Sequence, residues 1–277
     1  LHHDRRMSSP SSPAPAPTLS DWIAGARPKT LPAAVVPVLV GAGVAIGSVE
    51  SIGDDVVWWR VVGALAVSLL LQVGVNYAND YSDGVKGTDD ARVGPMRLVA
   101  TGTAAPGAVK RAALLSFALA AVVGLTLAVK TSWWLVAVGL AAIVSAWGYT
   151  GGPKPYGYLG LGEIFVFVFF GLVATVGTTY VAIEDVPGVT WPAATAVGLI
   201  ACALLVINNL RDIPTDEVAG KRTMAVRLGD ARTRWFYVAL TVGAFACVVV
   251  CAFSRPWALL GLLGMIPAIR PTREVLG

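Results

Sequence analysis

Eight long apolar runs, separated by more polar segments, constrain most strongly what this chain of 277 residues can fold into. A helix that crosses the hydrocarbon core of a bilayer, roughly 30 Å thick, needs about 20 mostly apolar residues. None of the runs alternates apolar and polar residues as barrel strands do, so helices are predicted. The predicted spans are 31–47, 58–79, 108–129, 133–148, 162–183, 191–210, 235–253 and 257–269.

The composition agrees with a membrane protein. Only 14% of the residues are charged, against roughly 25% in an average soluble protein. We therefore predict an all-α, polytopic transmembrane helix bundle that occupies residues 21–277 as one domain. Residues 1–20 differ, because the stretch 7–17 is almost entirely Ser, Pro and Ala, which is typical of a disordered tail. Part of this tail can be an expression remnant.

The distribution of basic residues predicts how the bundle is oriented. If the N-terminus is cytoplasmic, the inner segments hold all but three of the 21 Lys and Arg residues, the exceptions being Arg60, Lys130 and Arg255. Inner segments of membrane proteins are enriched in Lys and Arg. The N-terminus and the segments after the second and sixth spans are therefore expected in the cytoplasm. The net charge of +4 then concerns orientation and anionic substrates, and we expect no nucleic-acid partner.

Acidic residues gather at one end of the second span. Asn76, Asp80 and Asp83 are spaced so that, on a continuing helix, they share one face. The segment also carries basic residues suited to a diphosphate, namely Lys86, Arg92 and Arg97.

The sixth span ends in a similar way, with Asn208, Asp212 and Asp216. Pro214 disfavours helix at the preceding residue, so this helix is expected to bend or to end after Asp212. Its basic residues are Arg211, Lys221 and Arg222. Because the two motifs lie four spans apart, the sequence suggests two four-helix pseudo-repeats with long polar cytoplasmic loops.

Two carboxylate stripes that face each other at the mouth of a bundle would bind a hard divalent cation. Mg²⁺ usually takes one or two carboxylates together with phosphate oxygens and water. A solvated loop also carries mixed charge, but two matched segments with acids at the same helix end favour a site. The predicted metal ligands are Asp80, Asp83, Asp212 and Asp216.

At these residues the sequence resembles the UbiA-type intramembrane prenyltransferases. Residues 76–83 are similar to that family's first Asp-rich motif, and Asp212 with Asp216 is similar to its Asp-x3-Asp motif. Residues 27–32, 79–87, 149–158 and 221–229 are most similar to the branch that prenylates 1,4-dihydroxy-2-naphthoate (MenA). The family usually has nine transmembrane helices, whereas eight are predicted here.

The resemblance implies Mg²⁺-dependent transfer of a polyprenyl group from polyprenyl diphosphate to 1,4-dihydroxy-2-naphthoate or a similar aromatic acceptor. The carboxylate would be lost, and the reaction would serve menaquinone synthesis in the plasma membrane of a bacterium. Asn76 and Tyr149 would act beside the catalytic aspartates and stabilise an allylic cation in a dry cavity. The residues expected to bind substrate are Lys86, Arg92, Arg97, Lys221, Arg222, Asn208, Arg211, Lys154 and Tyr156.

Three alternatives stay open at this point. One is a prenyltransferase of the same superfamily with another aromatic acceptor. The second is a CDP-alcohol phosphotransferase, whose signature resembles Asp-x2-Asp-Gly-x2-Ala-Arg, but here Arg92 follows too far after Asp83 and Gly84. The third is a transporter, which predicts acidic residues near the middle of the membrane and not at one end.

Overall fold

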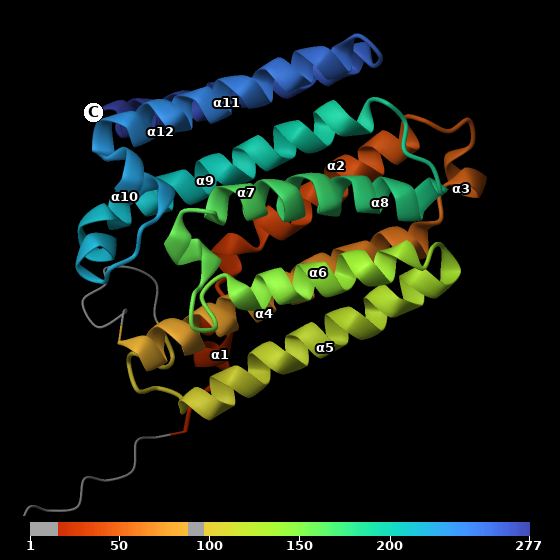
Figure 1. The fold of residues 1–277 in the computed structure, drawn as a ribbon. Helices are drawn as coiled ribbons and strands as arrows, with labels where there is room; N and C mark the ends of the chain where they lie inside the picture. The colour runs from red at the N-terminus through yellow and green to blue at the C-terminus, as the bar shows by residue number, and fades with distance from the viewer. Residues whose placement is uncertain (1–15, 88–96) are drawn as a thin grey trace, which may run out of the picture.

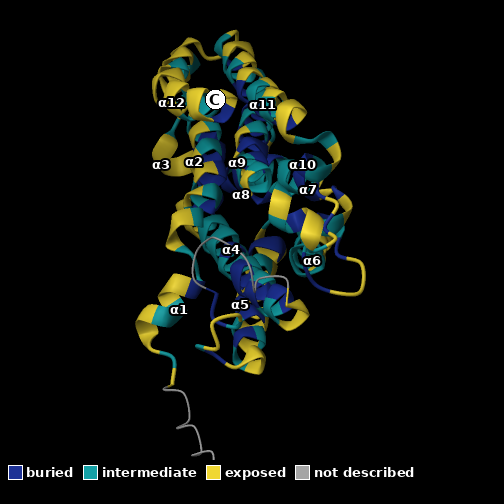
Figure 2. Ribbon diagram, turned by 90° about the vertical axis from the view of Figure 1, so that its left-hand side faces the viewer, coloured by how far each residue is buried: buried dark blue, intermediate teal, exposed yellow. Residues whose placement is uncertain are grey.

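The computed structural model describes residues 16–87 and 97–277, and within these ranges all regular structure is helical. The long helices lie side by side, and the short helices and turns gather at the two ends of the bundle (Figure 1). Buried residues concentrate where the long helices meet, while their outward faces are exposed (Figure 2). The predicted all-α bundle is confirmed. Arg92 and residues 1–15 of the predicted tail lie outside the described residues.

The first half of the described chain forms the following helices: α1 (Leu19–Gly25), η1 (Pro28–Thr30), α2 (Pro32–Ile46), α3 (Ile52–Asp55), α4 (Trp58–Lys86), α5 (Pro106–Lys130) and α6 (Trp134–Gly148). The second half continues with these: η2 (Tyr156–Leu159), α7 (Gly162–Val166), η3 (Phe167–Val173), α8 (Ala174–Ile183), α9 (Thr190–Val218), α10 (Met224–Leu228), α11 (Asp230–Ala252), η4 (Pro256–Gly264) and α12 (Met265–Leu276). Helix α1 begins inside the predicted tail, where the Thr18 side chain caps it.

Each of the eight apolar runs lies in helical structure, but the helices differ in length. Among the described residues, five are long and apolar enough to cross a membrane, or six if the bent pair formed by residues 19–30 and α2 counts as one span. Helix α6 is shorter, with 15 residues, and the last run is divided between η4 and α12. The protein is thus a multi-pass membrane protein, and the count of eight spans stays a prediction.

The chain bends sharply before it enters α2. Arg27 adopts a left-handed backbone conformation with a φ of 54°, and prolines at 28 and 32 limit helical hydrogen bonding on either side. The two helical pieces meet at an angle of 51°. This bend places the Ala26 carbonyl and the Thr30 hydroxyl against α4, where both accept hydrogen bonds from the Asn76 amide.

The two polar motifs extend long helices instead of forming loops. Helices α4 and α9 each have 29 residues and contain all six Asn and Asp positions of the predicted motifs. Pro214 lies inside α9, so the helix continues through Asp216 and the alternative end after Asp212 is wrong. Helix α4 packs against α5 and α9 packs against α11. This correspondence supports the predicted pseudo-repeat.

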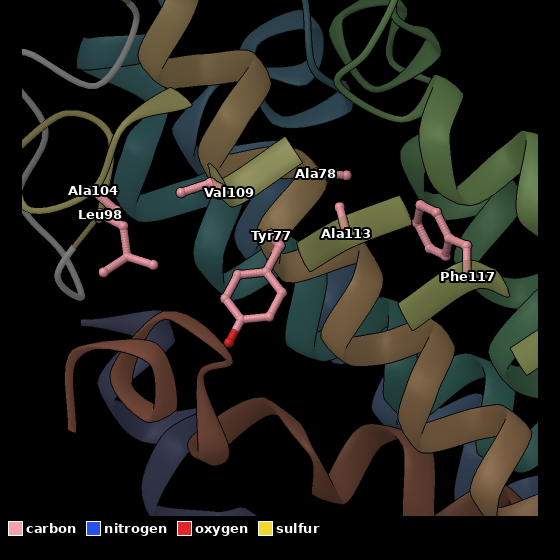
Figure 3. Packing of buried hydrophobic residues seen from close by; sticks show 7 residues of the cluster. All are labelled: Tyr77, Ala78, Leu98, Ala104, Val109, Ala113 and Phe117. Carbon is pink, nitrogen blue, oxygen red and sulfur yellow. The ribbon is translucent and has the colours of Figure 1, made fainter. Parts of the chain in front are cut away.

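A small apolar core fixes the polar end of α4. Tyr77, Leu98, Val109, Ala113 and Phe117 are buried together where α4 meets α5 and the segment after residue 97, as Figure 3 shows. The Tyr77 hydroxyl points toward α1 and donates a hydrogen bond to the Trp22 carbonyl at 2.7 Å. The last turns of α4, which carry the acidic motif, are therefore held from three sides.

Helix η3 is a π-helical segment inside the span that begins at Gly162. It packs so closely against α9 that a Cβ atom added to Gly171 would lie 2.5 Å from the Gly198 Cα atom. Backbone atoms cannot yield as a flexible side chain can, so only glycine fits here. The close approach brings the aromatic residues of α7 and η3 against the cavity described below.

Candidate active site

The first acidic motif lies in the last three turns of α4. Asn76, Asp80 and Asp83 are all buried, and Gly87 ends the helix in a left-handed conformation with a φ of 69°. Helical spacing at i, i+4 and i+7 puts the three side chains on one face, as the sequence predicts. This face contacts Arg97 and Leu98 through Asp83 and Asp80, and it contacts Tyr158 through Asp83.

Asp80 anchors the segment that follows residue 97. Its Oδ2 accepts a hydrogen bond from the Leu98 backbone N–H at 2.8 Å, and its Oδ1 accepts one from Val99 at 3.1 Å. The side chain is 1% exposed. Each carboxylate oxygen still has a lone pair for another partner. In this structure Asp80 therefore positions the neighbouring Arg97, and its predicted role as a metal ligand stays a prediction.

Asp83 joins three separate parts of the chain. Its Oδ1 accepts a hydrogen bond from the Tyr158 hydroxyl at 2.6 Å and lies 3.8 Å from Lys221 Nζ. Its Oδ2 lies 3.6 Å from an Arg97 guanidinium nitrogen. The side chains of all three charged residues are at most 10% exposed. Such a buried cluster holds its geometry, because water does not compete for the charges.

The second motif joins the first through Lys221. The Lys221 ammonium lies 4.0 Å from Asp216 Oδ1 and also stands over the Tyr158 ring, 4.8 Å from its centroid. Asp212 is buried and pairs with the adjacent Arg211 at 2.7 Å. We call Asp83, Arg97, Lys221 and Asp216 the ionic cluster. It brings together the ends of α4 and α9, which lie more than a hundred residues apart in the chain.

Three of the residues predicted to bind substrate, Lys86, Lys154 and Arg222, lie outside the ionic cluster in this structure. Lys86 Nζ donates hydrogen bonds to the Thr150 carbonyl at 2.7 Å and to the Gly152 carbonyl at 3.3 Å. It also stands over the Tyr158 ring at 5.1 Å. Lys154 and Arg222 are exposed, and the Arg222 backbone N–H donates to the Tyr158 carbonyl. Lys86 thus holds the loop before η2 in place, and its binding to a diphosphate stays a prediction.

A cavity of about 350 Å³ lies among α2, α4, α5, α6, α7–α8 and α9, and we call it the central cavity. Its walls are mainly apolar. Polar side chains lie mostly near the end closest to the ionic cluster, where Asn76, Asn79, Tyr149 and Asn208 line it. The predicted residues Asn76, Tyr149, Tyr156 and Asn208 therefore do share one site.

An amide network fixes Asn76 at the wall of this cavity. The Asn76 amide nitrogen donates to Ala26 and Thr30, and its Oδ1 accepts a hydrogen bond from Gln72 Nε2 at 3.2 Å. The Thr150 hydroxyl donates to Asn79 Oδ1 at 2.7 Å in the same region. Because each amide has partners within the protein, the orientations of these groups are set independently of any ligand.

Aromatic rings form a row in the wall of the central cavity. Tyr149 meets Tyr156 edge to face with a centroid distance of 5.5 Å, and Tyr156 stacks on Phe165 at 3.9 Å. Phe169 continues the row at 6.2 Å from Phe165. Burial, and secondly the nearby Tyr149, raise the pKa of Tyr156 above its ordinary value. Tyr156 thus stays protonated and donates a hydrogen bond to the Ser145 carbonyl at 2.8 Å.

Several residues of this site were not predicted from the sequence. The Tyr158 hydroxyl donates a hydrogen bond to Asp83, and the ammonium groups of Lys86 and Lys221 lie over the Tyr158 ring. Thr30, Phe165 and Phe169 line the central cavity. Tyr158 and Thr30 fall in stretches that carry the family resemblance, and this resemblance was the only indication in the sequence that they belong to the site. The two phenylalanines lie in an ordinary apolar run, and nothing in the sequence sets them apart.

No described group of three or more His, Cys, Asp or Glu residues is close enough to hold a metal ion by itself. The acidic residues nevertheless fit Mg²⁺, since they supply hard carboxylate oxygens at the end of an apolar cavity. Mg²⁺ commonly completes its shell with substrate phosphates and water and needs few protein ligands. The arrangement thus fits a metal that arrives with an anionic substrate better than a permanent protein cage.

Fold and site together define a class: a multi-pass helical membrane enzyme with an apolar cavity that ends in buried, alternating charges. The UbiA prenyltransferase family matches residues 34–272, and the chain belongs to this family. It is therefore a prenyltransferase. This assignment excludes the CDP-alcohol phosphotransferase and the transporter.

Similar proteins of known name agree with the assignment. The chain is 51% identical to the 1,4-dihydroxy-2-naphthoate octaprenyltransferase of Mycobacterium tuberculosis, over 93% of this chain and 87% of that protein. It is 36% identical to the Escherichia coli protein of the same name, over 92% and 84% of the two chains. A UbiA homologue from Archaeoglobus fulgidus, bound to GPP and Mg²⁺, has the same fold with a TM-score of 0.70. That likeness covers 91% of this chain and 86% of the other, at 16% identity.

Proposed function

We propose that this enzyme transfers a polyprenyl group from polyprenyl diphosphate to 1,4-dihydroxy-2-naphthoate, with loss of the carboxylate, as a step of menaquinone synthesis. The observation that carries the proposal is the ionic cluster beside the polar end of the central cavity. The cluster suits a diphosphate, and the cavity suits an apolar tail and an aromatic ring. The names of the relatives from M. tuberculosis and E. coli support the same substrates.

The basic residues of the cluster would receive the diphosphate. Arg97 and Lys221 are held by Asp83 in a buried position, so their charges are placed before the substrate arrives. Asp83 and Asp216, with Asp80 and Asp212 nearby in their helices, would hold Mg²⁺. When bound, Mg²⁺ would neutralise charge that develops on the leaving diphosphate.

The cavity would control what happens after the allylic carbon–oxygen bond breaks. The diphosphate leaves with the bonding electrons, and the remaining allylic cation needs electron-rich faces and no water. Tyr149 and Phe165 offer such faces, and the Asn76 amide offers a fixed dipole. The electron-rich naphthoate ring carbon that bears the carboxylate then attacks the allylic cation. The carboxylate leaves as CO₂, and the electrons of the broken carbon–carbon bond restore the aromatic ring.

The first test measures the reaction and its metal requirement. Purified protein with octaprenyl diphosphate and 1,4-dihydroxy-2-naphthoate should release diphosphate and form a prenylated naphthoquinol, which mass spectrometry identifies. Removing Mg²⁺ with a chelator should slow turnover at least about 100-fold, since a metal at a leaving group contributes several kcal/mol. Added Mg²⁺ should restore it. Undiminished turnover under chelation, or faster turnover with 4-hydroxybenzoate, would contradict the proposal.

We further propose that the ionic cluster faces the cytoplasm of a bacterial cell. The three basic residues expected on the outer side lie away from the cluster: Arg60 lies in the first turn of α4, Lys130 ends α5, and Arg255 follows α11. Arg60 bonds Glu184 at 2.5 Å and the Lys130 carbonyl at 3.0 Å, which joins the start of α4 to the ends of α5 and α8. The remaining basic residues then satisfy the positive-inside rule.

A topology experiment tests this orientation. A reporter that is active only outside the cytoplasm, fused after residue 130 or after residue 185, should be active in bacterial cells. The same reporter fused after residue 221 should be inactive and serves as the control. A cytoplasmic signal at either of the first two positions would overturn the orientation.

A further inference from the structure

The hydroxyl of Thr30 has a fixed direction at the polar end of the central cavity. It donates its hydrogen to the Arg27 carbonyl at 2.9 Å. A hydroxyl has only one hydrogen to donate, so toward its other neighbours the Thr30 oxygen acts as an acceptor. It accepts from Asn76 Nδ2 at 2.9 Å and from Gln72 Nε2 at 3.2 Å. The direction of this one hydroxyl therefore determines which atoms of two amides face it.

The Asn76 amide is held in one of its two orientations. Its nitrogen donates one hydrogen to Thr30 and the other to the Ala26 carbonyl, at 2.8 Å. In the reversed orientation the Asn76 oxygen would face this carbonyl and a hydroxyl whose hydrogen is already used, and neither could donate to it. The nitrogen thus points toward the bend before α2, and the oxygen is on the side of Gln72.

Gln72 completes the arrangement and leaves its own oxygen unsatisfied. It lies one turn before Asn76 in α4, and its nitrogen donates to Thr30 and to Asn76 Oδ1, each at 3.2 Å. Its Oε1 is buried and has no hydrogen-bond partner among the described residues. Such buried polar atoms are rare. Here the reversed amide would be worse, because it would place Oε1 against two oxygens that have no hydrogen to donate.

These contacts leave Asn76 with one unused bonding position. Both of its hydrogens are donated and Oδ1 accepts one hydrogen bond, so only the second lone pair of Oδ1 is available. An ionised diphosphate has no hydrogen to donate to this lone pair, whereas a positive charge is attracted to it. Asn76 lines the central cavity, and Asp80 and Asp83 are not among the described residues that do. Asn76 therefore belongs to the wall around the reacting prenyl group.

We propose that Gln72 is a positioning residue for prenyl transfer. By donating to Asn76 and Thr30, it holds the Asn76 amide with its oxygen toward the allylic carbon, where positive charge develops as the diphosphate leaves. A dipole that is already oriented stabilises this charge without having to reorganise during the reaction. The inference rests on the proposed function, since this charge arises only if a prenyl diphosphate is the substrate.

A double-mutant cycle tests whether Gln72 acts through Asn76. Gln72→Met keeps the length of the side chain and removes both hydrogen bonds, so kcat at saturating Mg²⁺ and substrates should fall about tenfold. KM for octaprenyl diphosphate should stay within about threefold, because the Asn76 oxygen does not bind the diphosphate. Asn76→Ala should lower kcat at least as much. In the Asn76→Ala protein, Gln72→Met should then have no further effect on kcat.

Thr179→Val is the matched control. The buried Thr179 hydroxyl also donates across helices, to the Gly41 carbonyl at 2.9 Å, but Thr179 is not among the residues that line the central cavity. Its loss should leave kcat near the wild-type value. Thr30→Val removes the oxygen that both amides share, so it should lower kcat as Gln72→Met does, and it tests the inference if Gln72→Met does not fold. Thermal melting in detergent verifies that each variant is folded.

The outcomes separate this inference from the proposed function. If wild-type protein transfers the prenyl group and folded Gln72→Met keeps its kcat within about threefold, only the inference is wrong. A loss on top of Asn76→Ala as large as in the wild-type background would also contradict it, since Gln72 would then act without Asn76. A higher half-saturating Mg²⁺ concentration with unchanged kcat would assign the Asn76 oxygen to the metal instead. If wild-type protein transfers no prenyl group, the proposed function fails, and the inference fails with it.

Discussion

Replacing Asp83 by Asn should lower kcat/KM for prenyl transfer by at least about a thousandfold, equivalent to roughly 4 kcal/mol of transition-state stabilisation. Asp83 is the residue that contacts Arg97, Lys221 and Tyr158 at once. The amide keeps the shape but removes the charge that places both basic residues. It also removes a predicted Mg²⁺ ligand, so substrate placement and leaving-group stabilisation are lost together.

Glu217→Gln is the control for this variant. Glu217 is a carboxylate in the same helix as Asp216, but it is exposed, so kcat/KM should stay within about threefold of wild type. Removing one partner of a buried ion pair can also destabilise the fold by about 3–5 kcal/mol. The melting temperature of Asp83→Asn therefore has to be measured beside its activity. A folded Asp83→Asn protein with activity within tenfold of wild type would refute the role given to Asp83.

Lys221→Gln should lower kcat/KM by at least about a hundredfold, through a loss of charge stabilisation on the diphosphate. In the structure the Lys221 ammonium lies between Asp83 and Asp216 and above the Tyr158 ring. Without it, the acidic ends of α4 and α9 lose the positive charge that joins them. We expect KM for the polyprenyl diphosphate to rise and kcat to fall, because the ammonium would contact the substrate before and during bond cleavage.

Lys221→Arg and Arg232→Gln complete this experiment. The conservative variant keeps the charge and should recover part of the activity, which a purely structural loss would not explain. Arg232 is an exposed basic residue at the start of α11, and its replacement should leave the kinetics near wild type. Equal kinetics for Lys221→Gln and Arg232→Gln would show that Lys221 has no part in substrate binding.

Helical periodicity is enough to predict which face of a helix carries the acidic residues. Spacing by three and four residues puts Asn76, Asp80 and Asp83 on one face, and all three are buried there in α4. Pro214 shows the limit of such local rules. A proline removes one helical hydrogen bond, yet α9 continues through it to Val218. Helix α9 packs against α10 and α11, and such tertiary packing can outweigh the local cost of a proline.

The partners of each polar side chain do not follow from spacing. By sequence, Asp80 and Asp83 are equivalent metal ligands, and Lys86 is a diphosphate ligand. In the structure, Asp80 binds the backbone of residues 98 and 99, Asp83 joins the ionic cluster, and Lys86 binds the loop before η2. Each of these contacts joins segments far apart in the chain, so no local spacing could indicate it.

The sequence by itself determined the membrane class, the helical fold and the faces that carry the acidic motifs. These properties depend on apolar length and helical period, and both are local features of a chain in a bilayer. Only the tertiary structure decided that Lys221 joins the two motifs and that aromatic rings line the central cavity. These features depend on how distant helices pack, and a side chain's role follows from the neighbours that packing supplies.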